Sequence, residues 1–111
     1  MIENYVRIGK ANQIFAKCYI NSNCIIGDNN IINTNAIIEH EVTIGSHCHI
    51  SVNSVLNGRV SIGNNCFIGA GSVVIDKIQI CNNVTIGANS TVVDNINTSG
   101  TYVGMPAKRI K

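Results

Sequence analysis

One aliphatic side chain recurs at every sixth position of this chain, without a break, from Ile8 to Val92. These residues, called the anchors below, are Ile8, Ile14, Ile20, Ile26, Ile32, Ile38, Ile44, Ile50, Leu56, Ile62, Ile68, Val74, Ile80, Ile86 and Val92. On an α-helix six residues turn about 600°, so successive anchors would form no single face. Six is even, so a strand-like path that turns one corner per repeat returns the same side chain to the inside. The period therefore excludes a helix and predicts an all-β solenoid.

The remainder of each six-residue unit supports this prediction. A small, mostly apolar residue stands two places before most anchors, where strand alternation also directs it inward. These residues are Cys18, Cys24, Ala36, Val42, Cys48, Ser54, Val60, Cys66, Ser72, Ile78, Val84 and Ser90. Glycine directly follows the anchor at positions 9, 27, 45, 63, 69 and 87, and the next places hold Asn, Asp, Ser and Ala. Such residues accept turn and left-handed conformations, so each unit is predicted to be one short strand and one corner.

The pattern small-x-aliphatic-Gly-x-x over residues 8–92 resembles the hexapeptide-repeat acyltransferases. The resemblance implies a left-handed parallel β-helix with three units per triangular coil, and hence about five coils. The handedness rests on the resemblance alone, because crossovers between parallel strands are normally right-handed. We expect a lead-in at residues 1–7, the β-helix at 8–93, and a C-terminal loop and cap at 94–111, where Thr98 stands in the expected anchor place.

Composition narrows the possible partners. The chain has 111 residues, which is enough for one domain. Its net charge of +2 and its lack of tryptophan give no basic, aromatic-rich surface for nucleic acid. There is no run of 18 apolar residues and no signal-peptide pattern at the start. We therefore expect a cytoplasmic protein with no nucleic-acid or membrane partner.

Polar residues also occupy inward positions. Four of the five cysteines fall on the inward position, namely Cys18, Cys24, Cys48 and Cys66. We expect them to pack there as free thiols. Cys81 falls at a corner and has no neighbouring base that would make it a nucleophile. Asn12 and Asn30 are inward and eighteen residues apart, so their amides are predicted to stack as a ladder.

The corner Glu39-His40-Glu41 departs from the repeat, because Gly, Asn or Asp is expected at a corner. A neutral imidazole that projects from a corner can accept a proton at pH 7. A flanking carboxylate can fix its tautomer and raise its basicity. His40 and Glu41 are therefore the candidate catalytic pair.

The segment 33–41, followed by Ile44-Gly45 and by His49-Ile50-Ser51, resembles sugar acetyltransferases of the sialic-acid O-acetyltransferase and bacillosamine-pathway N-acetyltransferase types. The resemblance implies that His40 is the general base, that Glu41 supports it, and that His49 contacts the acetyl group of acetyl-CoA. It implies direct transfer to an amine or hydroxyl of a sugar, with no metal. His47 matches no position of that family.

Further cofactor contacts are implied by the same resemblance. Ala70 and Ala88, on successive coils, fit places where the pantetheine arm lies, although both are also ordinary small corner residues. The ending Gly104-Met105-Pro106-Ala107-Lys108 resembles a Gly-x-Pro-Ala-Lys segment that lies near the phosphates of the coenzyme. Lys108 and Arg109 would then contact those phosphates, and a simple cap for the last coil is equally compatible.

The relation between the two histidines predicts an assembly. Nine residues is half of an eighteen-residue coil, so His40 and His49 should point to opposite sides of one chain. A site that uses both must form between subunits, as in the homotrimers of the family. The family also carries an N-terminal nucleotide-sugar domain, whereas this chain begins at the coils. Acceptor recognition is therefore expected from a separate domain or chain, or from the coils alone.

Two other functions remain open at this stage. A hexapeptide-fold zinc enzyme of the carbonic anhydrase type would need three histidine ligands, and His40, His47 and His49 supply that number but not the spacing. A non-catalytic β-solenoid would show a regular outward rank of one residue type, which the irregular outward positions lack.

Overall fold

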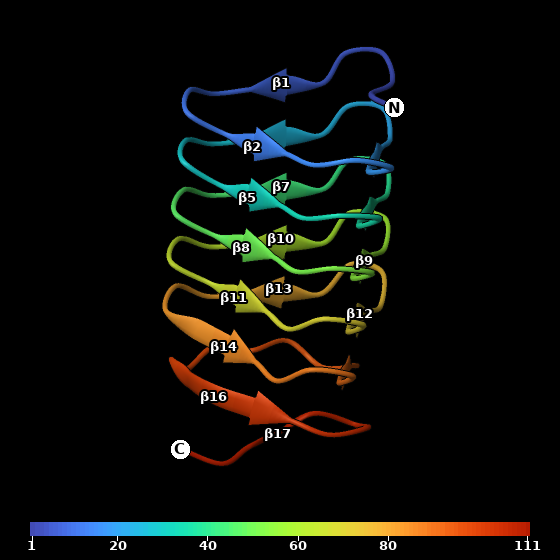
Figure 1. Ribbon diagram of the computed structural model, residues 1–111. Helices are drawn as coiled ribbons and strands as arrows, with labels where there is room; N and C mark the ends of the chain where they lie inside the picture. The colour runs from blue at the N-terminus through green and yellow to red at the C-terminus, as the bar shows by residue number, and fades with distance from the viewer.

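The computed structural model describes residues 1–111, which wind into a three-sided stack of short parallel strands (Figure 1). Paired strands are offset by eighteen residues, as where Ile26 pairs with Ile44, so one coil takes three six-residue units. In Figure 1 the front strands run to the right and those behind run to the left as the chain descends, which makes the coil left-handed. The predicted all-β, left-handed parallel β-helix of about five coils is confirmed.

The three sides of the stack are three sheets. The first consists of β1 (Arg7–Ile8), β4 (Ile25–Ile26), β7 (Thr43–Ile44), β10 (Ser61–Ile62) and β13 (Gln79–Ile80). The second consists of β2 (Gln13–Ile14), β5 (Ile31–Ile32), β8 (His49–Ile50), β11 (Phe67–Ile68), β14 (Val84–Ile86), β16 (Gly100–Val103) and β17 (Lys108–Arg109). The third consists of β3 (Tyr19–Ile20), β6 (Ile37–Ile38), β9 (Val55–Leu56), β12 (Val73–Val74) and β15 (Thr91–Val92).

Three corners join these sheets. The first corner leads from the first sheet to the second and includes residues 9–12 and their equivalents in later coils. The second corner leads from the second sheet to the third, from residues 15–18 onward, and the third corner leads back to the first sheet, from residues 21–24 onward. The anchors fill the space that the sheets enclose, and those from Ile20 to Val92 are all buried. Ile8 and Ile14 are more exposed, because no complete coil lies above them.

The corners turn at a left-handed residue that also recurs with period six. Every sixth residue from Tyr5 to Asn89 has a positive φ, and all except Gly71 carry a side chain. The glycine directly after the anchor was expected to accept a left-handed conformation, but its φ is not in that region. It is needed for space, because a Cβ on Gly27 would lie 2.6 Å from the carbonyl oxygen of Gly45 in the next coil. Glycine at this place therefore permits the close stacking of coils.

The small inward residues donate hydrogen bonds as well as fill space. Three of them that carry a donor group bond to the carbonyl oxygen fifteen residues ahead, in the next coil: Asn30 Nδ2 to Gly45 at 2.9 Å, Cys48 Sγ to Gly63 at 3.1 Å, and Ser72 Oγ to Gly87 at 2.9 Å. All five cysteines are free and only Cys81 is not fully buried, as predicted. The view of the thiols as purely apolar filling was incomplete, since their S–H groups satisfy buried carbonyl groups.

The predicted asparagine ladder also forms in a different way. The Oδ1 atom of Asn12 accepts the backbone N–H of Asn30 at 2.8 Å, and Oδ1 of Asn30 accepts the N–H of Cys48 at 2.8 Å. The two amides therefore do not bond to each other but to the backbone of the next coil. No buried side-chain nitrogen or oxygen lacks a hydrogen-bond partner.

The two ends differ from the predicted boundaries. Ile2 already pairs with Ile20, so the lead-in belongs to the first coil. The C-terminal loop and cap were expected outside the β-helix from residue 94 onward, but Ile96 pairs with Ile80 and Tyr102 pairs with Ile86. Both pairs are sixteen residues apart, which shows that the last corner is two residues shorter than the others. β17 then pairs antiparallel with β16, at the place of the expected cap. No helix of the chain is long and apolar enough to cross a membrane.

Candidate active site

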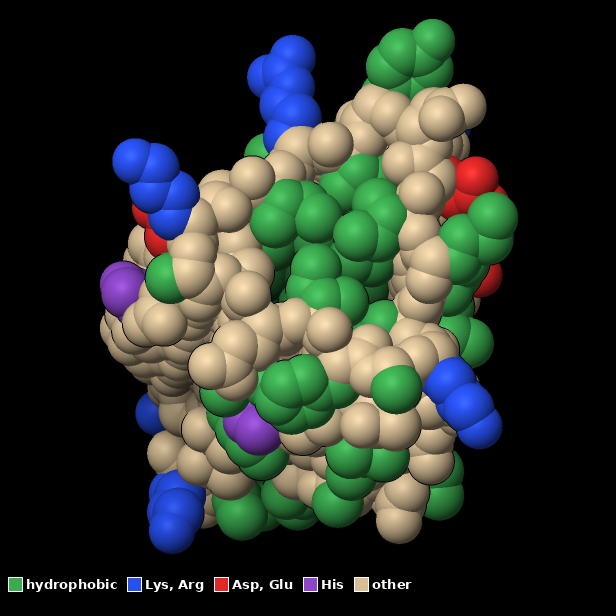
Figure 2. All heavy atoms as spheres, turned by 45° about the horizontal axis from the view of Figure 1, so that its top comes forward, with side chains coloured by type: hydrophobic (Ala, Val, Ile, Leu, Met, Phe, Trp, Pro, Cys, Tyr) green, Lys and Arg blue, Asp and Glu red, His purple; other side chains and the backbone are tan.

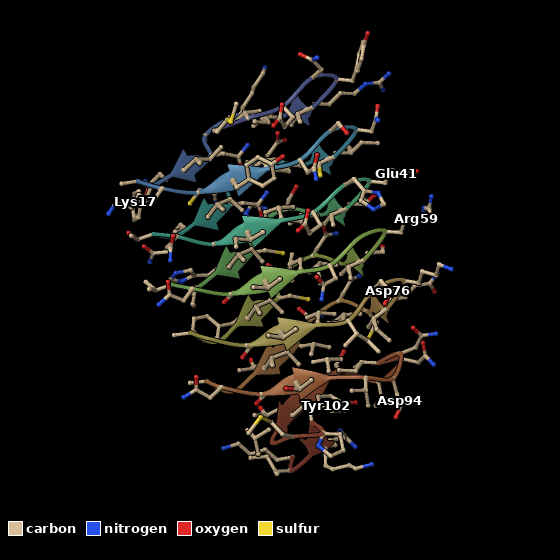
Figure 3. All side chains as sticks on the ribbon, turned by 90° about the vertical axis from the view of Figure 1, so that its right-hand side faces the viewer. Lys17, Glu41, Arg59, Asp76, Asp94 and Tyr102 are labelled. Carbon is tan, nitrogen blue, oxygen red and sulfur yellow. The ribbon has the colours of Figure 1, made fainter.

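His40, Glu41 and Arg59 form a hydrogen-bonded group on the third corner. His40 Nδ1 lies 3.1 Å from Glu41 Oε1, and Arg59 Nη2 lies 3.3 Å from the same oxygen. Glu41 occupies the left-handed corner position, with φ at 59°, and Arg59 occupies the same position one coil later. Figure 3 shows Glu41 and Arg59 projecting from one edge of the solenoid. The repeat itself therefore brings the carboxylate and the guanidinium together.

These contacts set the protonation pattern of the group. An ionised carboxylate only accepts hydrogen bonds, so Nδ1 of His40 must donate, and in the neutral ring the lone pair is on Nε2. The hydrogen bond from His40, and then the positive charge of Arg59, lower the pKa of Glu41 below its ordinary value. Glu41 is therefore ionised near neutral pH and can hold this tautomer. The arrangement gives His40 the form of a general base.

Gly58 provides the space for the His40 ring. A Cβ at position 58 would lie 2.6 Å from Nε2 and 2.9 Å from Cε1 of His40. The φ of Gly58 is not positive, so space rather than backbone conformation requires glycine here. The backbone N–H of Gly58 donates to no atom of the chain. The base nitrogen thus lies at the surface, beside a glycine with an available N–H donor.

Asn33 holds His49 in the same tautomer as His40 but occupies its Nε2 atom. The Oδ1 atom of Asn33 accepts the N–H of Thr34 at 2.7 Å, which directs Nδ2 toward His49 Nε2 at 3.3 Å. Because Nδ2 is a donor, Nε2 of His49 accepts, and the ring is neutral with its proton on Nδ1. The ring also packs edge-on against Phe67, with centroids 5.2 Å apart. His49 therefore presents an N–H donor rather than a base.

The two histidines lie apart within one chain. His40 follows β6 on the third corner, whereas His49 is in β8, on the sheet opposite that corner. The other residues predicted to bind the cofactor lie further along the chain. Ala70 and Ala88 are exposed on successive coils of the second corner, and Lys108 and Arg109 are exposed on β17.

A comparison with protein families identifies the repeat. The family described as bacterial transferase hexapeptide (six repeats) matches residues 5–40, 24–58 and 59–94. The chain belongs to the bacterial transferase hexapeptide family. A comparison with curated proteins found no match.

Solved hexapeptide transferases match the whole fold. PerB of Caulobacter crescentus, in complex with CoA and GDP-perosamine, is 35% identical with a TM-score of 0.97, covering 99% of this chain and 53% of that one. The acetyltransferase domain of PglB from Neisseria gonorrhoeae FA1090, in complex with acetyl coenzyme A, is 28% identical with a TM-score of 0.96, covering 98% and 53%. AntD of Bacillus cereus, at 20% identity and a TM-score of 0.93, covers 97% and 73% and shows the fold alone. The chain spans about half the length of PerB and PglB.

The structure of this hexapeptide transferase also bears on the zinc alternative. His40, His47 and His49 fall on the third corner, the first corner and the second sheet, and His47 Nδ1 contacts Asn29 Nδ2 at 2.9 Å. No three His, Cys, Asp or Glu side chains of the chain are grouped to hold a metal ion. The carbonic anhydrase interpretation thus gains no support from the geometry.

Three contributors to the site were missed from the sequence. Gly58 and Arg59 follow His40 and Glu41 by eighteen residues, and that spacing could have identified them once a coil of eighteen was predicted. Asn33 was quoted only as part of a motif. Its hydrogen bond to His49 crosses the second corner between two coils, and no spacing rule indicates which side chain is oriented to make it.

Proposed function

We propose that this chain is the acetyl-transfer unit of an acetyl-CoA-dependent sugar N-acetyltransferase that acts on a nucleotide-linked amino sugar. The observation that carries the proposal is the His40–Glu41 pair, with Nε2 of His40 free at the surface. It lies on a β-helix 34% identical to a perosamine N-acetyltransferase in complex with CoA and GDP-perosamine. That likeness favours an amine over a hydroxyl as the acceptor.

The proposed reaction needs one base and one hydrogen-bond donor. The acceptor amine attacks the thioester carbonyl carbon, the C–N bond forms, and the C–S bond breaks to release CoA. His40 Nε2 takes the proton that the nitrogen loses and returns it to the departing sulfur. The oxyanion that develops on the carbonyl is stabilised by the Gly58 N–H or by the Nδ1–H of His49. Acetyl-CoA is already activated, so no covalent enzyme intermediate is required.

The proposed assembly is a homotrimer in which His40 of one chain and His49 of the next share one acetyl group. The third sheet supports this arrangement, because its outward residues Ile37, Val55 and Val73 are aliphatic and only half-buried in the single chain. With that sheet toward a threefold axis, the third corner of one chain would meet the second corner of its neighbour. That neighbouring corner carries Asn33, which binds His49 Nε2 and fixes the orientation of the ring.

Acetyl-CoA would then extend from His49 toward the C-terminal coils. Ala70 and Ala88 succeed each other along the second corner, and their small side chains leave that path open. Lys108 and Arg109 stand exposed near its end, where they can contact phosphates. We propose these four residues as the cofactor contacts. Alanine at Lys108 or Arg109 should raise KM for acetyl-CoA without lowering kcat.

The direct test is acetyl transfer to a panel of acceptors. Purified protein should consume acetyl-CoA with UDP-, dTDP- or GDP-linked amino sugars, and the product should carry an N-acetyl group by mass spectrometry. Free sugars and free sialic acid form the comparison set. Transfer to hydroxyl groups alone would overturn the proposed N-acetylation. Absence of transfer to any sugar by a protein shown to be trimeric would overturn the proposed function.

A subunit-mixing experiment tests the shared site. His40→Ala and His49→Ala proteins, each inactive, are mixed after dissociation and reassembled. Mixed trimers contain some sites with both histidines and should regain activity above either parent. If subunit exchange is demonstrated and no activity returns, or if the active species is a monomer, the shared site is wrong.

A further inference from the structure

The N-terminal end of the third corner carries a hollow that the proposed reaction does not use. Its volume is about 420 Å³, and Tyr5, Val6, Arg7, Asn23 and Ile25 line it. This lies within the range of small-molecule sites, which is roughly 300 to 1,000 Å³. The other hollow, beside His47 and His49, measures about 230 Å³. Figure 2 shows the N-terminal end, where hydrophobic side chains are exposed and basic side chains stand at the rim.

Tyr5 is in an unfavourable conformation without compensation from packing. Its φ is 62°, in the left-handed region that aromatic residues rarely adopt. Seven of the fourteen other left-handed corner positions hold asparagine, which tolerates this conformation, and none holds another aromatic carbocycle. Tyr5 is 81% exposed, so its ring gains little from the protein. A strained and exposed aromatic residue is a reason to look for a ligand, and a flat ring is suited to stacking against a nucleobase.

Arg7 supplies a positive charge that nothing in the chain neutralises. It lies on β1 in the wall of the hollow, and its guanidinium makes no ion pair and no hydrogen bond. No acidic residue lines the hollow. The nearby carboxylate of Glu3 accepts a hydrogen bond from the Tyr19 hydroxyl at 2.9 Å, on the third sheet and away from Arg7. A free guanidinium of this kind suits the paired oxygens of a phosphate.

The hollow lies on the same corner as the candidate base. Tyr5, Asn23 and Glu41 occupy the same left-handed position in three successive coils. Neighbouring coils are about 5 Å apart, so Tyr5 is about 10 Å from Glu41 along the corner. The ribose and diphosphate that join a base to its sugar can span such a separation. A ligand with its base at Tyr5 would therefore place its sugar near His40.

We infer that this hollow binds the nucleoside diphosphate part of the acceptor, with the base stacked on Tyr5 and the phosphates on Arg7. Ile25, which is 48% exposed, forms the apolar floor under the base, and Asn23 offers its amide to the ribose. The placement of the sugar at His40 rests on the proposed function. Binding of the nucleotide itself does not.

The test is nucleotide binding to the full chain in the absence of acetyl-CoA. UDP, dTDP and GDP are titrated by calorimetry and by amide chemical shifts, with pyrophosphate and free amino sugar as comparisons. At least one nucleoside diphosphate should bind, more tightly than pyrophosphate. Arg7→Gln and Tyr5→Ala should each weaken binding about tenfold, the loss expected for one charge-assisted or stacking contact. Tyr5→Phe should retain the affinity.

Lys10→Gln is the matched control, because Lys10 is an exposed cation of the same coil that lies on the first corner, outside the hollow. Equal weakening by Lys10→Gln and Arg7→Gln would indicate general charge attraction and overturn the site. No nucleotide binding by folded wild-type protein would also overturn it. Nucleotide binding without acetyl transfer would support the hollow and refute the proposed function. If acetyl transfer occurs and the acceptor KM is unchanged in Arg7→Gln and Tyr5→Ala, the proposed function is supported and the binding site in the hollow is refuted.

Discussion

The first and third corners are built from the same repeat but use their polar atoms differently. In the first corner, backbone N–H groups are taken by side chains of the next coil: Lys10 by Asp28, Asp28 by Ser46, and Ser46 by Asn64, at 2.8 to 3.0 Å. Glycines stack beneath one another at the turn. The polar groups of this corner therefore hold one coil to the next.

The third corner leaves its polar groups for other partners. Around His40 the side chains bond to one another rather than to the backbone, and they are about half exposed. The Gly58 N–H has no partner in the chain. A repeat protein can thus maintain its stack with two corners and release the third for chemistry. The predictions below test this division by making comparable changes in both corners.

Histidine substitution should separate the corners most strongly. His40→Ala should lower kcat by about 10² to 10⁴, the contribution of a general base, without affecting the fold. His47→Ala in the first corner should leave kcat within a factor of about two, because the only hydrogen bond of the His47 side chain is to Asn29. Acetyl transfer and circular dichroism on both proteins provide the measurement. An active, folded His40→Ala protein would remove His40 from the mechanism.

The buried asparagine of the first corner should matter for stability. Asn30→Ala leaves the Gly45 carbonyl and the Cys48 N–H without partners, at an expected cost of about 2 to 4 kcal/mol in the free energy of unfolding. Asn57→Ala in the third corner should cost less than about 0.5 kcal/mol, since the Asn57 side chain makes no hydrogen bond in the chain. Urea unfolding measures both. Equal losses would contradict the division between corners.

The same glycine substitution should damage stability in one corner and activity in the other. Gly45→Ala places a Cβ 2.9 Å from backbone atoms of Gly63, so we expect about 1 to 3 kcal/mol of destabilisation. Gly58→Ala meets only the movable His40 ring, so the fold should persist while kcat falls about tenfold or more as Nε2 is displaced. Thermal unfolding and kcat are measured for both proteins. Full activity of Gly58→Ala would show that the ring position is not critical.

The Glu41 carboxylate should give the smallest effect. Its pKa is lowered in the folded protein by the His40 hydrogen bond and by Arg59. The stabilisation is therefore present above the ordinary glutamate pKa and is lost as the pH falls through the lower folded value. Wild type should have a slightly higher Tm than Glu41→Gln at pH 7, and the difference should shrink as the pH falls below the ordinary glutamate pKa of about 4.3. A difference that grows on acidification would reverse the assigned sign.

The sequence determined the architecture more fully than the site. The anchors set the coil, and its length of eighteen follows from the family resemblance. The sequence also separated His40 from His49. Reading the inward cysteines as apolar filling missed their hydrogen bonds, because only coordinates show which carbonyl groups lie above them. The end of the last coil was predicted wrongly because Thr98 stands where the period of six places the next anchor. The third corner is two residues shorter there, so Ile96 takes the anchor position, and a strict period of six cannot reveal this.

The covered and uncovered ends of the stack give the molecule a direction of growth. At the C-terminal end, β17 lies along β16, and residues 104 and 107 bond to Thr91 at the end of the third sheet. The parallel stacking of the second sheet ends here, because its last strand, β17, runs antiparallel to β16. At the N-terminal end, β1 and β2 have nothing paired on their outer side. A further parallel coil, from a fused segment or a separate polypeptide, would therefore find unpaired parallel strands of the first and second sheets at the end that bears Tyr5 and Arg7.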